Sequence, residues 1–136
     1  MDTPSHQPYF KLRGSWNWRS ADDEQMLIMG GNKIAAIRKH PLLTWYHELF
    51  EAYLSESDSR LMVIVYGFRD PHINRMIVRA AGKNPSMLLF LVDPRGRSIL
   101  PKQIAAIDDA GTSRPPLKDT FGGNEAERRK LMSFFC

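Results

Sequence analysis

The chain has 136 residues, of which 43% are hydrophobic and 25% charged, which is ordinary for a globular domain with no low-complexity tract. It contains no run of about 18 apolar residues, so we expect no membrane span, and its net charge of +4 comes from dispersed basic residues that do not favour a nucleic-acid partner. Cys136 is the single cysteine and cannot form an internal disulfide, and the first residues lack a signal-peptide pattern, so the expected location is the cytoplasm.

The sequence of the first third of the chain predicts only short secondary-structure elements joined by loops. Residues 1–8 contain two prolines and few apolar groups, which predicts a disordered lead. Residues 9–12 and 25–29 are short strand candidates. Residues 13–25 are rich in Gly, Asn, Ser and acidic groups, and we interpret them as a loop. A turn is expected at 30–33, where two glycines precede Asn.

A long helix is predicted next. Pro41 suits the first helical position, because proline lacks the N–H that would be unpaired there. The helix is expected to end near Ser55, where a polar loop begins. Its broad apolar face consists of Leu42, Leu43, Trp45, Tyr46, Leu49, Phe50, Tyr53 and Leu54.

The middle of the chain predicts a β-α-β unit. Residues 61–66 form an apolar, β-branched run, which indicates a strand covered on both faces. Asp70 offers an N-cap oxygen and Pro71 a first helical position. A helix with apolar residues at helical spacing and a second buried strand at 87–93 follow. Such a unit implies a parallel sheet, whose ligands bind at the carboxyl ends of the strands.

The remainder predicts less regular structure. Residues 99–108 suggest a short helix or a turn. Residues 109–123 contain Gly, Thr, Ser and two prolines, which predicts a linker. Asn124 is placed to cap a last helix within 124–136. We therefore predict one domain over residues 9–108, followed by this linker and helix.

Three segments carry a family resemblance. Residues 61–74 combine a strand with the turn Tyr-Gly-Phe-Arg-Asp-Pro-His-Ile-Asn, and residues 11–18 read Lys-Leu-Arg-Gly-Ser-Trp-Asn-Trp. A glycine-rich segment, Met-Gly-Gly-Asn-Lys, occupies 29–33. In their order along the chain, these segments resemble the C-terminal half of bacterial sirtuin-like domains, over residues 9–95. Members of that family are NAD-binding Rossmann-type proteins, and many are NAD hydrolases of antiphage defence.

The resemblance implies an α/β fold, a three-layer Rossmann-like parallel sheet. A complete doubly wound fold needs two halves, and this chain supplies only the second. It also lacks a glycine-rich phosphate loop of the Gly-x-Gly-x-x-Gly kind. We therefore expect a truncated domain, completed by a partner chain or by self-association.

The resemblance also suggests site residues. Arg13 stands where the family has its catalytic His, and an arginine cannot act as a base because it stays protonated. Val65 stands where the family has Gly before Tyr. The NAD-binding candidates are Gly14, Ser15, Tyr66, Gly67, Phe68, Asn74 and Asp93.

Asp93 has two interpretations. It is a ribose-binding carboxylate at a strand end, or a turn residue of Asp-Pro-x-Gly. No metal-ligand spacing is found among the histidines and the terminal cysteine.

Two functions follow from the sequence. The first is NAD binding or hydrolysis in the assembled form, with catalysis impaired in this chain. The second is a non-catalytic remnant or interaction module that docks on a partner chain. The absent phosphate loop, Arg13 and Val65 favour the second for the isolated chain.

Overall fold

The computed structural model describes residues 11–135, which divide into an N-terminal unit ending at Phe50 and a C-terminal unit beginning at Glu51. The predicted lead at 1–8 and the first two residues of the predicted strand at 9–12 lie outside the described residues, and Lys11 and Leu12 do not belong to a strand. Within residues 11–135, no helix is both long and apolar enough to cross a membrane.

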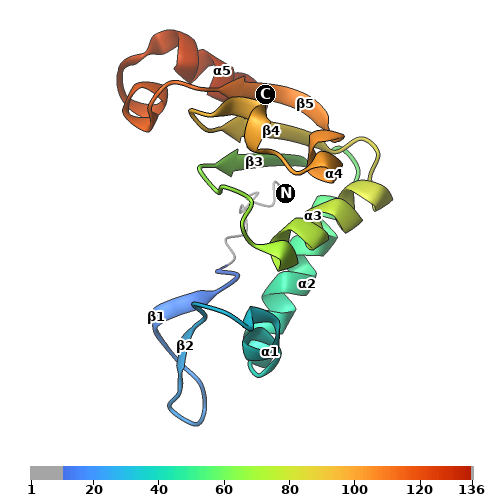
Figure 1. The fold of residues 1–136 in the computed structure, drawn as a ribbon, viewed down its shortest axis with the longest axis vertical. Helices are drawn as coiled ribbons and strands as arrows, with labels where there is room; N and C mark the ends of the chain where they lie inside the picture. The colour runs from blue at the N-terminus through green and yellow to red at the C-terminus, as the bar shows by residue number, and fades with distance from the viewer. Residues whose placement is uncertain (1–10, 136) are drawn as a thin grey trace, which may run out of the picture. The chain divides into compact units, whose positions relative to one another are not determined.

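The N-terminal unit begins with a two-stranded antiparallel sheet, β1 (Gly14–Arg19) and β2 (Gln25–Leu27) (Figure 1). The prediction of a loop over 13–25 was wrong for β1, whereas the strand predicted at 25–29 is present as β2. The hairpin closes where Ser20 N–H donates to the Glu24 carbonyl over 2.9 Å and Asp23 adopts a left-handed φ of 60°. Pairing with β2 thus overrides the weak strand propensity of the Gly-, Asn- and Ser-containing segment.

Two helices follow in the chain. The short α1 (Lys33–Arg38) was not predicted, while α2 (Pro41–Ser55) has the predicted bounds. The core of the N-terminal unit is small and joins β2 to both helices. Its buried members are Met26, Ile28, Ile37 and Leu43, with Trp18 and Ala36 packed against them.

The C-terminal unit contains a three-stranded parallel sheet in the order β3-β4-β5. Strand β3 (Arg60–Ile64) leads through α3 (Pro71–Lys83) to β4 (Leu88–Val92). The predicted β-α-β unit and its parallel pairing are therefore confirmed. The mixed α/β architecture is compatible with a Rossmann-like fold.

The third strand is β5 (Asp108–Ser113), which pairs parallel with β4. Its sequence was predicted to belong to a linker, and that prediction was wrong. The stretch is polar, but β4 presents an unpaired edge whose backbone groups need partners. The link between β4 and β5 holds η1 (Gly96–Ile99) and α4 (Lys102–Ala105), in line with the predicted short helix or turn.

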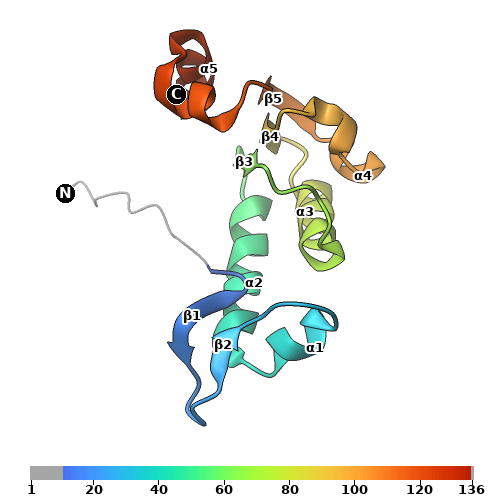
Figure 2. The same ribbon diagram turned by 60° about the vertical axis from the view of Figure 1, so that its left-hand side comes forward.

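The chain ends with η2 (Asp119–Gly123) and α5 (Glu125–Phe135). As predicted, Asn124 caps the last helix: its Oδ1 accepts from the Glu127 N–H over 3.2 Å. Helix α5 follows β5 and lies beside the sheet (Figure 2). It packs on the sheet through Leu131 and Phe134, which cluster with Phe90 and Val92 of β4.

Burial differs between the first two strands of this sheet. From Leu89 to Val92, β4 is at most 1% exposed, because it lies between two strands. Strand β3 lies at an edge, and Ile64 remains 46% exposed. The expectation that both faces of the segment 61–66 are covered was therefore wrong at its carboxyl end.

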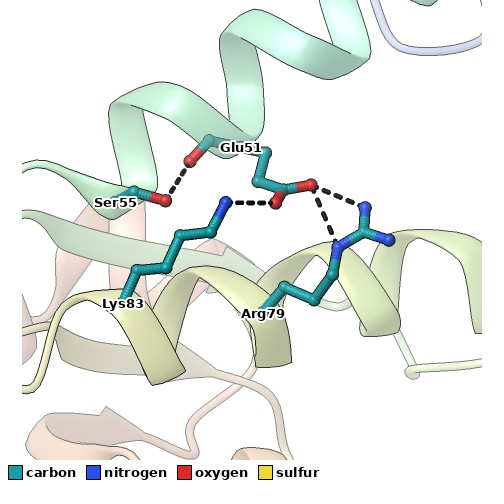
Figure 3. Close-up of polar contacts among 4 residues, drawn as sticks. All are labelled: Glu51, Ser55, Arg79 and Lys83. Atoms are coloured by element: carbon teal, nitrogen blue, oxygen red, sulfur yellow. Dashed lines mark hydrogen bonds and ion pairs between the residues drawn. The ribbon is translucent and has the colours of Figure 1, made fainter.

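Polar contacts tie the last turns of α2 to α3 (Figure 3). Glu51 accepts from Arg79 Nη2 over 2.6 Å and from Lys83 Nζ over 3.0 Å. Asn84, buried just after α3, donates to the carbonyls of Leu54 and Glu56 over 3.1 and 2.6 Å. These bonds fix the loop that enters β3 and so help to position the carboxyl end of that strand.

Candidate functional site

The candidate site lies at the carboxyl edge of the parallel sheet in the C-terminal unit. The chain leaves β3, β4 and β5 on the same side of the sheet (Figure 1). Because parallel strands share this edge, residues distant in sequence are brought together there. Tyr66, Gly67, Phe68 and Asn74 follow β3, and Asp93 follows β4.

The turn after β3 is held by its own polar groups. Tyr66 Oη lies 3.2 Å from the Asp70 carbonyl oxygen and 3.1 Å from Asn74 Oδ1. Asn74 Nδ2 donates to the Phe68 carbonyl over 2.8 Å. Asp70 Oδ1 accepts from the N–H of His72 over 3.0 Å, which confirms the predicted N-cap. Tyr66 and Asn74 thus have a structural role, whichever ligand the turn binds.

Three residues of this turn have left-handed backbone conformations. Val65, Gly67 and Phe68 have φ values of 44°, 72° and 54°. A β-branched residue in this region is an outlier, because its Cβ crowds the following carbonyl. The position where the resemblance places a glycine is therefore one whose backbone favours glycine.

We expect Val65→Gly to stabilise the protein by about 1 kcal/mol, because glycine adopts φ of 44° without steric strain. Val65 is 46% exposed, so only part of its apolar surface is buried and lost in the change. Urea unfolding of both proteins measures the change.

Ile64→Gly is the matched control. Ile64 precedes Val65, is also β-branched and is equally exposed at 46%, but its φ is not left-handed. This change should destabilise the strand, by about 0.5–1 kcal/mol. If Val65→Gly lowered stability as the control does, strain at Val65 would be ruled out.

The carboxylate of Asp93 accepts hydrogen bonds from Arg95, which lies on the same loop. Its side chain is fully buried, and Arg95 donates from Nε to Oδ1 and from Nη2 to Oδ2, each over 2.9 Å. The Arg95 backbone N–H also donates to Oδ1 over 2.9 Å. Hydrogen bonds from Arg95 lower the pKa of Asp93, and the same pair raises the pKa of Arg95. Both carboxylate oxygens already have donors, which favours the turn interpretation of Asp93 over direct ribose binding.

The loops after adjacent strands lie against one another. A Cβ placed on Gly67 would lie 3.8 Å from Arg95 Nη2, so the Arg95 guanidinium borders the β3 turn. A Cβ on Gly96 would lie 3.2 Å from Arg114 Cδ, so the stem of Arg114 borders the loop after β4. The carboxyl edge therefore presents guanidinium groups beside the left-handed turn.

Arg13, Gly14 and Ser15 belong to the N-terminal unit, where Gly14 and Ser15 begin β1. Gly14 has φ of 75°, and a Cβ there would lie 1.6 Å from the Met26 carbonyl oxygen. Ser15 Oγ donates to Asn17 Oδ1 over 2.8 Å and accepts from Lys11 Nζ over 3.1 Å. Close packing of the hairpin backbone therefore explains why residue 14 is a glycine, and no bound ligand is needed to explain it.

Sequence reasoning missed Arg69, Arg95 and Arg114 as site residues. Each is exposed and follows the end of one parallel strand. That spacing was visible for the first two, but Arg114 was hidden because β5 was predicted to be linker. Within the part of the chain that the structure describes, no three His, Cys, Asp or Glu side chains gather as a metal site would require.

No family model matches this chain, and a search of curated proteins gives no match either.

Proposed function

We propose that this chain is the C-terminal half of a sirtuin-like NAD-binding domain, which binds NAD without cleaving it. The observation that carries the proposal is the carboxyl edge of the parallel sheet. There the turn after β3, which has left-handed backbone conformations and is held by its own hydrogen bonds, lies beside the Arg95–Asp93 pair. In open α/β sheets this edge is where nucleotides bind.

The fold of the C-terminal unit supports this proposal. Helix α5 packs on the Phe90 and Val92 face of β4, and α3 buries Met76, Ile77 and Ala80. With α3 and α5 on opposite faces, the unit would have the three layers of a Rossmann-like half. The family resemblance of residues 9–95 adds NAD as the expected nucleotide.

The absence of cleavage follows from the chemistry of two residues. Arg13 occupies the position of the family's catalytic His, and a guanidinium cannot accept a proton near neutral pH. Asp93 is already hydrogen-bonded to Arg95 and is not free to act as a base. In a defence system of this family, such a chain would bind NAD or need a partner that supplies the catalytic group.

A non-catalytic docking module is the second candidate, favoured by the edges of the sheet. Strand β3 pairs only with β4 among the described strands, and its sequence is Arg-Leu-Met-Val-Ile. The opposite edge, β5, carries Asp108, Asp109 and an irregular register, features that protect edge strands. The apolar β3 edge would accept a strand from a partner chain or a second copy.

Calorimetric titration of the full chain with NAD tests the first proposal, and an assay for released nicotinamide tests cleavage. We expect saturable binding and no nicotinamide. Gly67→Ala should weaken binding, because it strains a residue with φ of 72° and adds bulk toward Arg95.

Gly82→Ala is the matched control. It lies in α3, without a left-handed φ, and its Cβ would meet no atom within 4 Å. Absence of NAD binding at millimolar concentration, together with concentration-dependent self-association in light scattering, would reject the first candidate in favour of the docking module. Nicotinamide release by the pure chain would contradict the argument from Arg13.

A further inference from the structure

The three parallel strands are each followed by an exposed arginine. Arg69 follows β3, Arg95 follows β4, and Arg114 comes directly after the last residue of β5. Because the strands are parallel and adjacent, these residues lie on loops at one edge of the sheet. We call them the arginine row.

Two close approaches join the loops that carry the row. Arg95 Nη2 would lie 3.8 Å from a Cβ on Gly67, two residues before Arg69. Arg114 Cδ would lie 3.2 Å from a Cβ on Gly96, the residue after Arg95. The central arginine thus borders the loop of the first, and the third borders the loop of the second.

Acidic groups near the row are already engaged. Asp93 is bound through both oxygens by Arg95, and buried Asp70 accepts N–H groups at the start of α3. Glu127 accepts from Ser113 Oγ and from Lys130 Nζ, each over 2.6 Å. No acidic side chain among residues 11–135 forms an ion pair with Arg69 or Arg114, so their charges are uncompensated.

The hydrogen-bonding capacity of the row is also largely unused. An arginine carries five N–H donors. Arg69 donates to no other group of the described chain, and Arg114 makes a single long contact of 3.5 Å to the Pro94 carbonyl. Arg95 uses Nε and Nη2 for Asp93, with its side chain still 52% exposed.

We propose that the arginine row binds a diphosphate group, as found in NAD and in nucleoside diphosphates. This rests on the proposed function and identifies the part of the ligand that the edge recognises. The chain lacks a glycine-rich loop whose backbone N–H groups would hold phosphates. Guanidinium groups supply planar, charged donors that suit phosphate oxygens and would perform that role here.

A short anion fits the row better than a long nucleic acid. Adjacent strands are about 4.8 Å apart, so three neighbouring loops span only about 10 Å. Arg79, Arg97 and Arg129 of this unit are paired with Glu51, Asp109 and Glu125, whereas Arg60, Arg75 and Arg128 form no ion pair among the described residues.

Calorimetric titration of the full chain with inorganic pyrophosphate, ADP and NAD tests the proposal. We expect Arg69→Gln with Arg114→Gln to weaken pyrophosphate and ADP binding by at least about tenfold, because each change removes charge-assisted hydrogen bonds. Arg95 is left intact because it holds Asp93. Lys102→Gln is the control for the loss of a positive charge outside the row. It lies on α4, which precedes the amino end of β5, and should change binding by less than about twofold.

Titrations with pyrophosphate and with NAD distinguish diphosphate binding by the arginine row from NAD binding by the chain. Pyrophosphate binding that needs Arg69 and Arg114, without any binding of NAD, would support the arginine row and reject NAD as the ligand. NAD binding that the double variant leaves unchanged would overturn the arginine row and retain the proposed function. Tighter binding of a short oligonucleotide than of pyrophosphate would also overturn it. Thermal melts that match the wild type would show that the double variant is folded.

Discussion

Gly14→Ala is expected to unfold the N-terminal hairpin, at a cost of about 3 kcal/mol. The added Cβ would lie 1.6 Å from the Met26 carbonyl oxygen, which belongs to the backbone and cannot rotate away. The left-handed φ of 75° adds strain for any residue with a side chain. The best probe is the Ile28 amide, which donates to the Arg13 carbonyl over 2.8 Å, and its hydrogen exchange should become much faster.

Gly31→Ala is the control for this change. It lies in the same unit, has no left-handed φ, and its Cβ would meet no atom within 4 Å. Exchange at Ile28 should therefore be unaffected. Unchanged protection of Ile28 in Gly14→Ala would mean that the hairpin accommodates the side chain and that the packing explanation of Gly14 is wrong.

Phe90→Ala should destabilise the C-terminal unit by about 3–5 kcal/mol, the usual cost of removing a buried aromatic side chain. Phe90 is 1% exposed, and its ring centroid lies 5.6 Å from that of Phe134 in an edge-to-face pair. Loss of this ring removes part of the surface on which α5 packs and leaves a cavity beside the central strand. Denaturant unfolding followed by circular dichroism measures the loss.

Met132→Ala is the control on the helix that Phe90 contacts. Met132 belongs to α5 but is 56% exposed, so its truncation should cost less than about 0.5 kcal/mol. If the two variants lost similar stability, α5 would not be packed on the sheet through the Phe90 face.

The sequence by itself determined the β-α-β unit and helix α2. The apolar runs of β3 and β4, the cap at Asp70 and Pro71, and Pro41 at the start of α2 are local signals. Local signals suffice there because the residues that specify each element lie within it. The parallel pairing followed in turn, and with it the place of the candidate site at the carboxyl edge.

Only the tertiary structure explains why β5 is a strand. Its sequence, Asp-Asp-Ala-Gly-Thr-Ser, has low strand propensity and carries no apolar alternation. It is a strand because β4 offers an edge and because Gly111 lies under Phe90, where a Cβ would be 2.6 Å from the ring. That contact joins residues far apart in sequence, so no local pattern could predict it.

The same distinction holds for the site. The sequence identified the turn at 66–68, Asn74 and Asp93 from their places after predicted strands. It could not show that Arg95 covers both oxygens of Asp93, since that depends on the folded path of the loop. Nor could it align Arg114 with Arg69 and Arg95, because this alignment exists only once β5 joins the parallel sheet. Local sequence patterns predicted the location of the site. Its positive charge, and the hydrogen bonds that already engage Asp93, depend on contacts that form only in the folded sheet.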